Sequence, residues 1–196
     1  MFTGIVQTVG RITELKPVGQ AAAVTFDAGG LDLSDVAVGD SIACNGICMT
    51  VTRLVRDGFT VDVSHETLRV TTGFTQGAAI NLEKSLRLAD RLGGHLVSGH
   101  VDGIGEVRKI NAVDGNWEIT INFPRDLSRY FARKGAVTVN GVSLTINALD
   151  GDSFLINLIP HTLVATNLGE LKKNSRVNLE VDLVARYVER ILMTSK

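Results

Sequence analysis

The stretch SIACNGICMTV at residues 41–51 has a relative, AVTVNGVSLTI, at residues 136–146. Each has Asn-Gly between two short runs of small and β-branched residues, which is the strongest short-range signal of a two-residue β-hairpin turn. Such a turn places Cys44 opposite Ile47 and Ala43 opposite Cys48. Because the two stretches are 95 residues apart, we predict that the chain contains the same hairpin twice.

Three further blocks repeat in the same order around the hairpins. Residues 3–10 resemble 98–105 and residues 59–71 resemble 154–166 at the same offset, and residues 80–83 resemble 177–180 at an offset of 97. Matching blocks in one order indicate an internal duplication. The period is far longer than the roughly 20 to 50 residues of solenoid repeats, so each copy should be a domain with its own core.

The composition and the local pattern favour an all-β fold. The length of 196 residues suits two domains of about 100 residues each. Short segments of alternating or β-branched residues, separated by Gly, Asn and Asp, are typical of small barrels or sandwiches. One short helix is expected in each copy, with Ser64 as its N-cap in the first and Pro160 at its first position in the second. The junction between the copies is expected in residues 88–94.

The segment after Asp182 has no partner in the first copy. It carries an apolar stripe at helical spacing, made of Val184, Tyr187, Val188, Ile191 and Leu192. Such a helix either docks on its own domain or assembles subunits, and the stripe alone leaves both alternatives open.

Charge and composition exclude several classes of protein. A net charge of −1 gives no basic face for nucleic acid. No apolar run reaches the roughly 20 residues of a membrane span, and the start of the chain lacks the features of a signal peptide, so a cytoplasmic protein is expected. Cys44 and Cys48 are too few and too close for a disulfide framework.

The outer face of each predicted hairpin carries small polar or apolar side chains. Directly opposed residues share a face, so the first hairpin has a core face and a second face that we call the first shelf: Ser41, Ala43, Cys48 and Thr50. The equivalent second shelf consists of Ala136, Thr138, Ser143 and Thr145. A solvent face usually carries long charged residues, and neither shelf does. A ligand-binding surface is therefore favoured over a plain solvent face.

The two copies differ at reactive positions. Cys44 lies on the core face, where it acts as a small hydrophobe, whereas Cys48 on the first shelf can meet a ligand. His100 aligns with Ile5, so an imidazole that titrates near neutrality occurs in one copy only. The four histidines lack metal-ligand spacing, and no metal site is expected. Two related sites with unequal groups suit a reaction in which two similar molecules play different parts.

Five motifs carry a resemblance to a known family: MFTGIV at 1–6, NGICMTV at 45–51, ETL at 66–68, GGHLVSGH at 93–100 and NGVSLT at 140–145. With them the chain resembles the riboflavin synthases (alpha chain) of the lumazine-binding repeat family, from its start to the terminal helix. The resemblance implies two tandem six-stranded Greek-key barrels and a C-terminal α-helix. It implies barrels at 1–92 and 93–183 and a trimerisation helix at 184–196.

The reaction that the resemblance implies is a dismutation of two 6,7-dimethyl-8-ribityllumazine molecules. One donates a four-carbon unit to the other, which gives riboflavin and 5-amino-6-ribitylamino-uracil in the last step of riboflavin biosynthesis. No cofactor and no metal are expected. The family is a homotrimer with each active site between the N-terminal barrel of one subunit and the C-terminal barrel of its neighbour, and lumazine synthase is a candidate partner.

The resemblance also implies site residues by position. Residues associated with turnover fall on Ser41, Cys48, His100, Thr145 and Asp182. Lumazine contacts assigned to the first barrel are Gly4, Ile5, Val6, Cys48, Met49, Thr50, Asp62, Val63, Ser64, His65, Glu66 and Thr67. Those assigned to the second barrel are Gly99, His100, Val101, Lys134, Ser143, Leu144, Thr145, Leu158, Ile159, Pro160, His161, Thr162 and Leu163. His161 stands where some members have Glu, which affects only the expected binding of the ribityl chain.

The implied chemistry begins at the 7-methyl group of one lumazine, whose protons are acidic because the ring delocalises the carbanion. His100 is the expected general base, and Ser41 or Cys48 would add to the second ring or direct water onto it. Two alternatives remain. A non-catalytic lumazine or flavin carrier would have lost His100 and the second shelf, and both are present. A flavin barrel of a reductase would require a nicotinamide domain for which no length remains.

Overall fold

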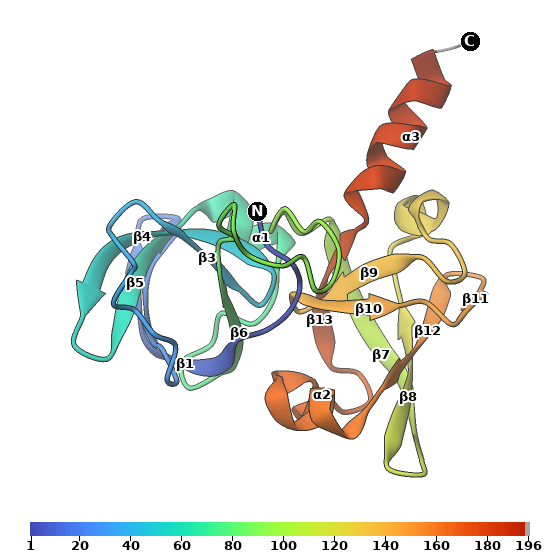
Figure 1. Cartoon of the computed structure of the whole chain (residues 1–196), viewed down its shortest axis with the longest axis horizontal. Coiled ribbons are helices and arrows are strands. Elements are labelled where there is room, and N and C mark those ends of the chain that lie inside the picture. The colour runs from blue at the N-terminus through green and yellow to red at the C-terminus, as the bar shows by residue number, and fades with distance from the viewer. Residues whose placement is uncertain (195–196) are drawn as a thin grey trace.

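Both predicted hairpins are present in the computed structural model, which describes residues 1–194 (Figure 1). In the first copy β3 (Ser41–Cys44) pairs with β4 (Ile47–Val55), and in the second β9 (Ala136–Val139) pairs with β10 (Val142–Thr145). Every residue pair of the two hairpins is in the predicted register. The alternation of the side chains between the two faces is therefore confirmed.

The two turns have the expected backbone conformation. Asn45 and Gly46 have φ values of 49° and 78°, and Asn140 and Gly141 have φ values of 47° and 79°. A two-residue turn that follows the twist of its strands needs positive φ at both central positions, and Asn-Gly adopts it at low cost.

The first copy is a closed barrel with the strand order β1-β2-β5-β4-β3-β6. Because β6 pairs with both β1 and β3, the sheet has no free edge. The order places β5 between β2 and β4, as in Greek-key barrels. The remaining strands are β1 (Thr8–Val18), β2 (Ala21–Asp27), β5 (Gly58–Val63) and β6 (Ala79–Lys84).

The second copy repeats this order in a seven-stranded sheet, β10-β9-β13-β7-β8-β12-β11. Its other strands are β7 (Gly103–Val113), β8 (Asn116–Asn122), β11 (Ala148–Asp150), β12 (Ser153–Leu158) and β13 (Arg176–Val181). The single strand β4 of the first copy corresponds here to β10 and β11, so this half is a curled half-barrel whose ladder is open between them.

The interruption coincides with a bulge in the first copy. The pairing of β4 with β5 shifts register between Val51 and Arg53, which leaves Thr52 as the extra residue. Thr52 aligns with Asn147, which lies between β10 and β11. An extra unpaired residue bends a strand and disrupts its ladder. The same irregularity thus bends the strand in one copy and divides it in the other. The expected all-β fold of two repeats with a C-terminal helix is confirmed.

The short helices begin where the sequence predicts them. In α1 (His65–Val70) the Ser64 hydroxyl accepts a hydrogen bond from the backbone N–H of Thr67 at 3.1 Å, and α2 (Pro160–Ala165) begins with its proline. Two 3₁₀ helices are also present, η1 (Arg125–Tyr130) and η2 (Asn167–Glu170).

The C-terminal helix α3 (Leu183–Thr194) projects away from both sheets (Figure 1). Its contact with η1 is polar, since Glu189 pairs with Arg129 at 2.7 Å and also accepts from Tyr130. The side chains of the predicted stripe are exposed by 49 to 64%, so the helix does not dock its apolar face on its own domain. Residues 195–196 of the expected helix segment lie outside the described residues. No helix within residues 1–194 is long and apolar enough to cross a bilayer.

The two copies meet along a seam with approximate twofold symmetry. Phe2 and Val97, which precede equivalent blocks, exchange backbone hydrogen bonds of 2.8 and 3.1 Å. On the same seam Asn81 donates to the carbonyl of Asn140 at 2.9 Å. The N-terminus therefore lies between the two halves, as Figure 1 shows.

Candidate active site

The core faces of both hairpins are buried as predicted, except that Leu144 is half-buried against the second core. The shelves, however, are not open surfaces. Ser41 and Cys48 are half-buried and Thr50 is exposed, whereas Ala43 is buried against Phe2 and Val97. On the second shelf Thr138 is buried, Ala136 and Ser143 are half-buried and Thr145 is exposed. Each shelf is partly roofed by another segment of the chain.

The roof of each shelf comes from the other repeat. The backbone N–H of Cys48 donates to the carbonyl of Gly99 at 2.8 Å, and that of Ser143 donates to the carbonyl of Gly4 at 2.7 Å. We call residues 98–101 the second cover segment and residues 3–6 the first cover segment, after the copy that each begins. The second cover segment lies on the first shelf, and the first cover segment lies on the second shelf.

Only glycine fits at the two crossing points. A Cβ atom on Gly99 would lie 2.7 Å from Cys48 Cβ, and one on Gly4 would lie 2.6 Å from Ser143 Cβ. Both glycines also have left-handed φ, +80° and +75°, which residues with a Cβ rarely adopt. These glycines therefore allow the close approach of each cover segment to its shelf.

The cover segments also exchange core residues. Val6 packs against the hydrophobic core of the second copy, and Val101 packs against that of the first. The structure therefore places Gly4, Ile5 and Val6 with the second shelf, although sequence order had assigned them to the first barrel. It likewise places His100 with the first shelf.

Residues after each hairpin add a further wall. Pairing of β5 with β4 places Asp62 next to the end of the first shelf, and α1 follows directly. In α1 the carboxylate of Glu66 is paired with Arg69 at 2.6 Å. The equivalent residues of the second copy are the exposed Ile159, Pro160 and His161 at the start of α2 and the half-buried Thr162 and Leu163.

Several predicted contact residues turn their side chains inward. Met49 and Val63 are buried in the core of the first copy and Leu158 in that of the second, while Leu144 packs against the second core. These residues can meet a ligand only through backbone groups or partly exposed atoms. Lys134 is exposed and has a φ of +67° where the first copy has Gly39. A strained backbone at a non-glycine residue is an observation that often accompanies function.

The expected turnover residues divide between the two shelves. Ser41 and Cys48 belong to the first shelf, and His100 is part of the second cover segment, which lies on it. Thr145 belongs to the second shelf, whereas the Asp182 carboxylate caps α3 by accepting from the N–H of Val184 at 3.0 Å. Within residues 1–194 no hydrogen bond joins a residue of the first shelf to one of the second.

His95 is a polar residue of the site that the sequence analysis did not single out. Its Nδ1 lies 2.7 Å from the Ser143 hydroxyl, and its buried Nε2 has no hydrogen-bond partner in the described residues. Burial lowers the pKa of His95, and the charge of Asp182 opposes this effect. In the sequence His95 directly follows Gly94 in the motif at 93–100. The structure shows why glycine is needed there, because a Cβ on Gly94 would lie 2.2 Å from the carbonyl oxygen of Thr3.

The two cysteines differ as predicted. Burial raises the pKa of the Cys44 thiol, which lies in the core of the first copy at 2% exposure. Such a thiol is unreactive, because the thiolate is the nucleophile. Cys48 is half-buried under the second cover segment, and both cysteines are free.

A cavity of about 470 Å³ adjoins Ser41 at the end of the first shelf. Thr3, Ile5 and the segment after β6 form part of its wall. Some of its charged residues form ion pairs, since Lys84 pairs with Asp35 at 2.6 Å and Arg87 with Asp90 at 3.2 Å. Within residues 1–194 no group of three His, Cys, Asp or Glu side chains is placed to hold a metal ion.

Comparisons with known proteins agree with this arrangement. The profile of the family described as "Lumazine binding domain" matches residues 3–85 and 98–182. Riboflavin synthase of Photobacterium phosphoreum is 44% identical over 198 residues, which cover 100% of this chain and 91% of that protein. Riboflavin synthase of Bacillus subtilis (strain 168) is 42% identical over 194 residues, which cover 98% and 90%. The structure of LumP complexed with riboflavin has a TM-score of 0.86 at 28% identity and covers 92% of this chain and 99% of LumP.

Proposed function

The chain belongs to the lumazine binding domain family, and we propose that both of its repeats bind 6,7-dimethyl-8-ribityllumazine during a single reaction. The function is that of a riboflavin synthase (EC 2.5.1.9), because relatives of that name match the chain along its whole length at 42 to 44% identity. The reaction is a transfer of four carbon atoms between two identical molecules, so two related but unequal binding sites suit it.

The observation that carries the proposal is the pair of shelves with their cover segments. Each has a half-buried thiol or hydroxyl, Cys48 or Ser143, beneath a glycine of the other repeat. The sites differ where chemistry would require it, because His100 accompanies Cys48, whereas Ile5 holds the equivalent place beside Ser143. One lumazine would bind at each shelf.

The first shelf has the groups for proton transfer. His100 is exposed and lies next to Gly99 above Cys48, so its imidazole can remove a 7-methyl proton as a general base. The Ser41 hydroxyl or the Cys48 thiol can add to a ring carbon or hold water against it. At the second shelf Ser143 and Thr145 would orient the other lumazine, with Asp182 nearby. Orientation of two bound rings contributes up to about 7 to 11 kcal/mol in favourable cases.

We place the complete active site between subunits. No hydrogen bond joins the two shelves within the described residues, and the apolar side of α3 is exposed in the single chain. A ring of three subunits would bury these stripes and bring the first shelf of one subunit to the second shelf of its neighbour. The proposed units are a first barrel at 1–92, a second at 93–183 and a trimerisation helix at 184–196, whose last two residues lie outside the described part.

The free cysteines fit a reducing cytoplasmic location. Association with lumazine synthase stays a prediction, which co-sedimentation of the two purified proteins would test.

The decisive experiment incubates the purified chain with 6,7-dimethyl-8-ribityllumazine alone and follows the fluorescence of riboflavin. We expect turnover without added cofactor, unchanged after exhaustive chelation. In His100→Gln we expect binding to be retained and turnover to fall by about 10²- to 10⁴-fold, the usual contribution of a general base. Tight binding without product would favour a carrier of lumazine or flavin; the similar protein LumP has been solved in complex with riboflavin. A requirement for one specific metal would contradict the metal-free reaction.

A further inference from the structure

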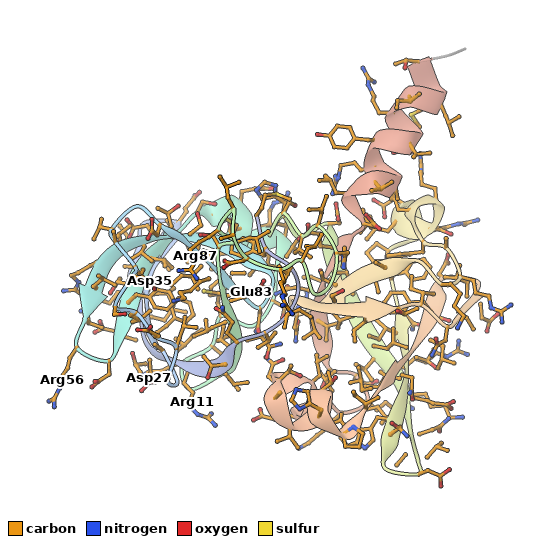
Figure 2. All side chains as sticks on the ribbon, in the orientation of Figure 1. Arg11, Asp27, Asp35, Arg56, Glu83 and Arg87 are labelled. Carbon is orange, nitrogen blue, oxygen red and sulfur yellow. The ribbon has the colours of Figure 1, made fainter. Side chains whose placement is uncertain are left out.

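Two buried carboxylates occupy equivalent positions in the two copies. Glu83 near the end of β6 is 5% exposed and Glu180 near the end of β13 is 2% exposed. Neither forms an ion pair within residues 1–194. Figure 2 shows Glu83 on the side of the first barrel that faces the second repeat, opposite Arg56. Burying a carboxylate is costly unless several donors satisfy it, so the donors reveal what each group holds in place.

Glu83 holds the first cover segment. One of its oxygens accepts from the backbone N–H and the hydroxyl of Thr3 at 2.7 and 2.6 Å, and the other accepts from the N–H of Gly4 at 3.0 Å. The Thr3 hydroxyl in turn accepts from the N–H of Ile5 at 3.1 Å. A single carboxylate therefore fixes the chain where it crosses to the other repeat.

Glu180 holds the second cover segment in the same manner, with one more bond. It accepts from the N–H and the hydroxyl of Ser98 at 2.7 and 2.6 Å and from the N–H of Gly99 at 2.9 Å. The backbone N–H of His100 adds a bond of 3.1 Å. Glu180 thus fixes the backbone of the imidazole-bearing residue as well as the glycine above Cys48.

The cover segments cross between repeats, and so does the influence of each carboxylate. Gly99, held by Glu180 of the second copy, accepts the N–H of Cys48 on the first shelf. Gly4, held by Glu83 of the first copy, accepts the N–H of Ser143 on the second shelf. We propose that Glu180 is a positioning residue for the first shelf and Glu83 for the second, so that each carboxylate supports the ligand site of the repeat to which it does not belong.

The two positions should differ in their effect on the reaction, and this part rests on the proposed function. Glu180 orients His100, so its loss should lower kcat. Glu83 holds Gly4, which precedes the exposed Ile5. Because Ile5 has no group for proton transfer, loss of Glu83 should raise KM more than it lowers kcat. Interactions made only in the transition state affect kcat, whereas uniform binding affects KM.

The test uses the two thiols and needs no turnover. Cys48 lies beneath Gly99, and Cys44 is buried and serves as an internal monitor of unfolding. In Glu180→Gln, one acceptor oxygen is replaced by an amide group that donates and would face N–H groups. The second cover segment should therefore move away from Cys48. A buried N–H group left without an acceptor is costly, and we expect Cys48 to react with a thiol reagent about tenfold faster or more. The pseudo-symmetric control, Glu83→Gln, should leave the Cys48 rate unchanged.

Each result decides between crossed and local support. Faster reaction of Cys48 in Glu180→Gln alone, with Cys44 unreactive, supports the proposal. Faster reaction in Glu83→Gln, or equal rates in both variants, would overturn it. If Cys44 also reacts, the variant has unfolded, and Ser98→Ala with Thr3→Ala as its control replaces the pair, because each removes a single hydroxyl donor. A wild-type chain without turnover would refute the proposed function and leave the thiol result intact.

Discussion

Replacing Gly99 by Ala should damage the first shelf more than an equivalent change elsewhere. Gly99 has a φ of +80°, and its added Cβ would lie 2.7 Å from Cys48 Cβ and 2.9 Å from both Cys48 N and Phe2 Cε2. Two of these three atoms belong to Cys48, so the methyl group can be accommodated only if the second cover segment moves away from the shelf.

The size of the effect follows from two contributions. A left-handed φ costs an L-residue about 1 to 2 kcal/mol, and overpacking a well-filled site costs about 1 to 3 kcal/mol. The free energy of unfolding should therefore fall by about 2 to 5 kcal/mol. Gly77 is a matched control because its φ is +82° and nothing lies within 4 Å of the position that an added Cβ would take. Gly77→Ala should show only the backbone contribution.

The assay combines urea unfolding with steady-state turnover, measured where both variants are fully folded. Gly99→Ala should lose more stability than Gly77→Ala by about 1 to 3 kcal/mol, and its turnover should fall further because His100 follows the displaced residue. Equal stability losses with equal turnover would refute the close approach of residue 99 to Cys48. A normal rate of turnover in Gly99→Ala would refute the role of the cover segment in the site.

Three other predictions test separate parts of the molecule. Cys44→Ala should lower the free energy of unfolding by about 1 kcal/mol with little kinetic effect, whereas Cys48→Ala should mainly lower turnover; equal kinetic defects would contradict the assignment of faces. Burial raises the pKa of Glu83 and Glu180 above the 4.5 of an unfolded glutamate, so their contribution to stability is present at low pH and lost as pH rises through the raised pKa values. Urea unfolding at several pH values should show that the free energy of unfolding decreases less above pH 4.5 in Glu180→Gln than in the wild type. An equal decrease in the two proteins would argue against a raised pKa of Glu180. A chain without residues 185–196 should keep both repeats folded but lose activity steeply on dilution, as followed by sedimentation; a fully active monomer would exclude an intersubunit site.

Local patterns were sufficient for the hairpins and the short helices. Alternating side chains beside Asn45-Gly46 determine which residues face the core, because opposed residues in a two-residue hairpin must share a face. The separation of Cys44 from Cys48 follows from that rule. Ser64 and Pro160 likewise predicted the starts of α1 and α2, since helix caps depend on neighbours within one turn.

The arrangement of the site required contacts between distant residues. Thr3 and Glu83 are separated by 80 positions, and Ser98 and Glu180 by 82. The position of His95 beside Ser143 spans 48. Periodicity within a short stretch of sequence does not reveal contacts between residues so far apart. The break between β10 and β11 is also a matter of tertiary structure, since the aligned Thr52 is accommodated as a bulge within one strand.

The sequence by itself determined the duplication, the hairpin registers and the two unequal shelves, because each depends on identity or alternation among neighbouring residues. Only the tertiary structure decided which segment covers which shelf. Aligning the two repeats assigns each cover segment to the barrel of its own repeat. The same local sequence would be found whether the segment stays on that barrel or crosses to the other. The crossing is visible only in the bonds from Cys48 to Gly99 and from Ser143 to Gly4, where buried backbone groups of one repeat find their partners in the other.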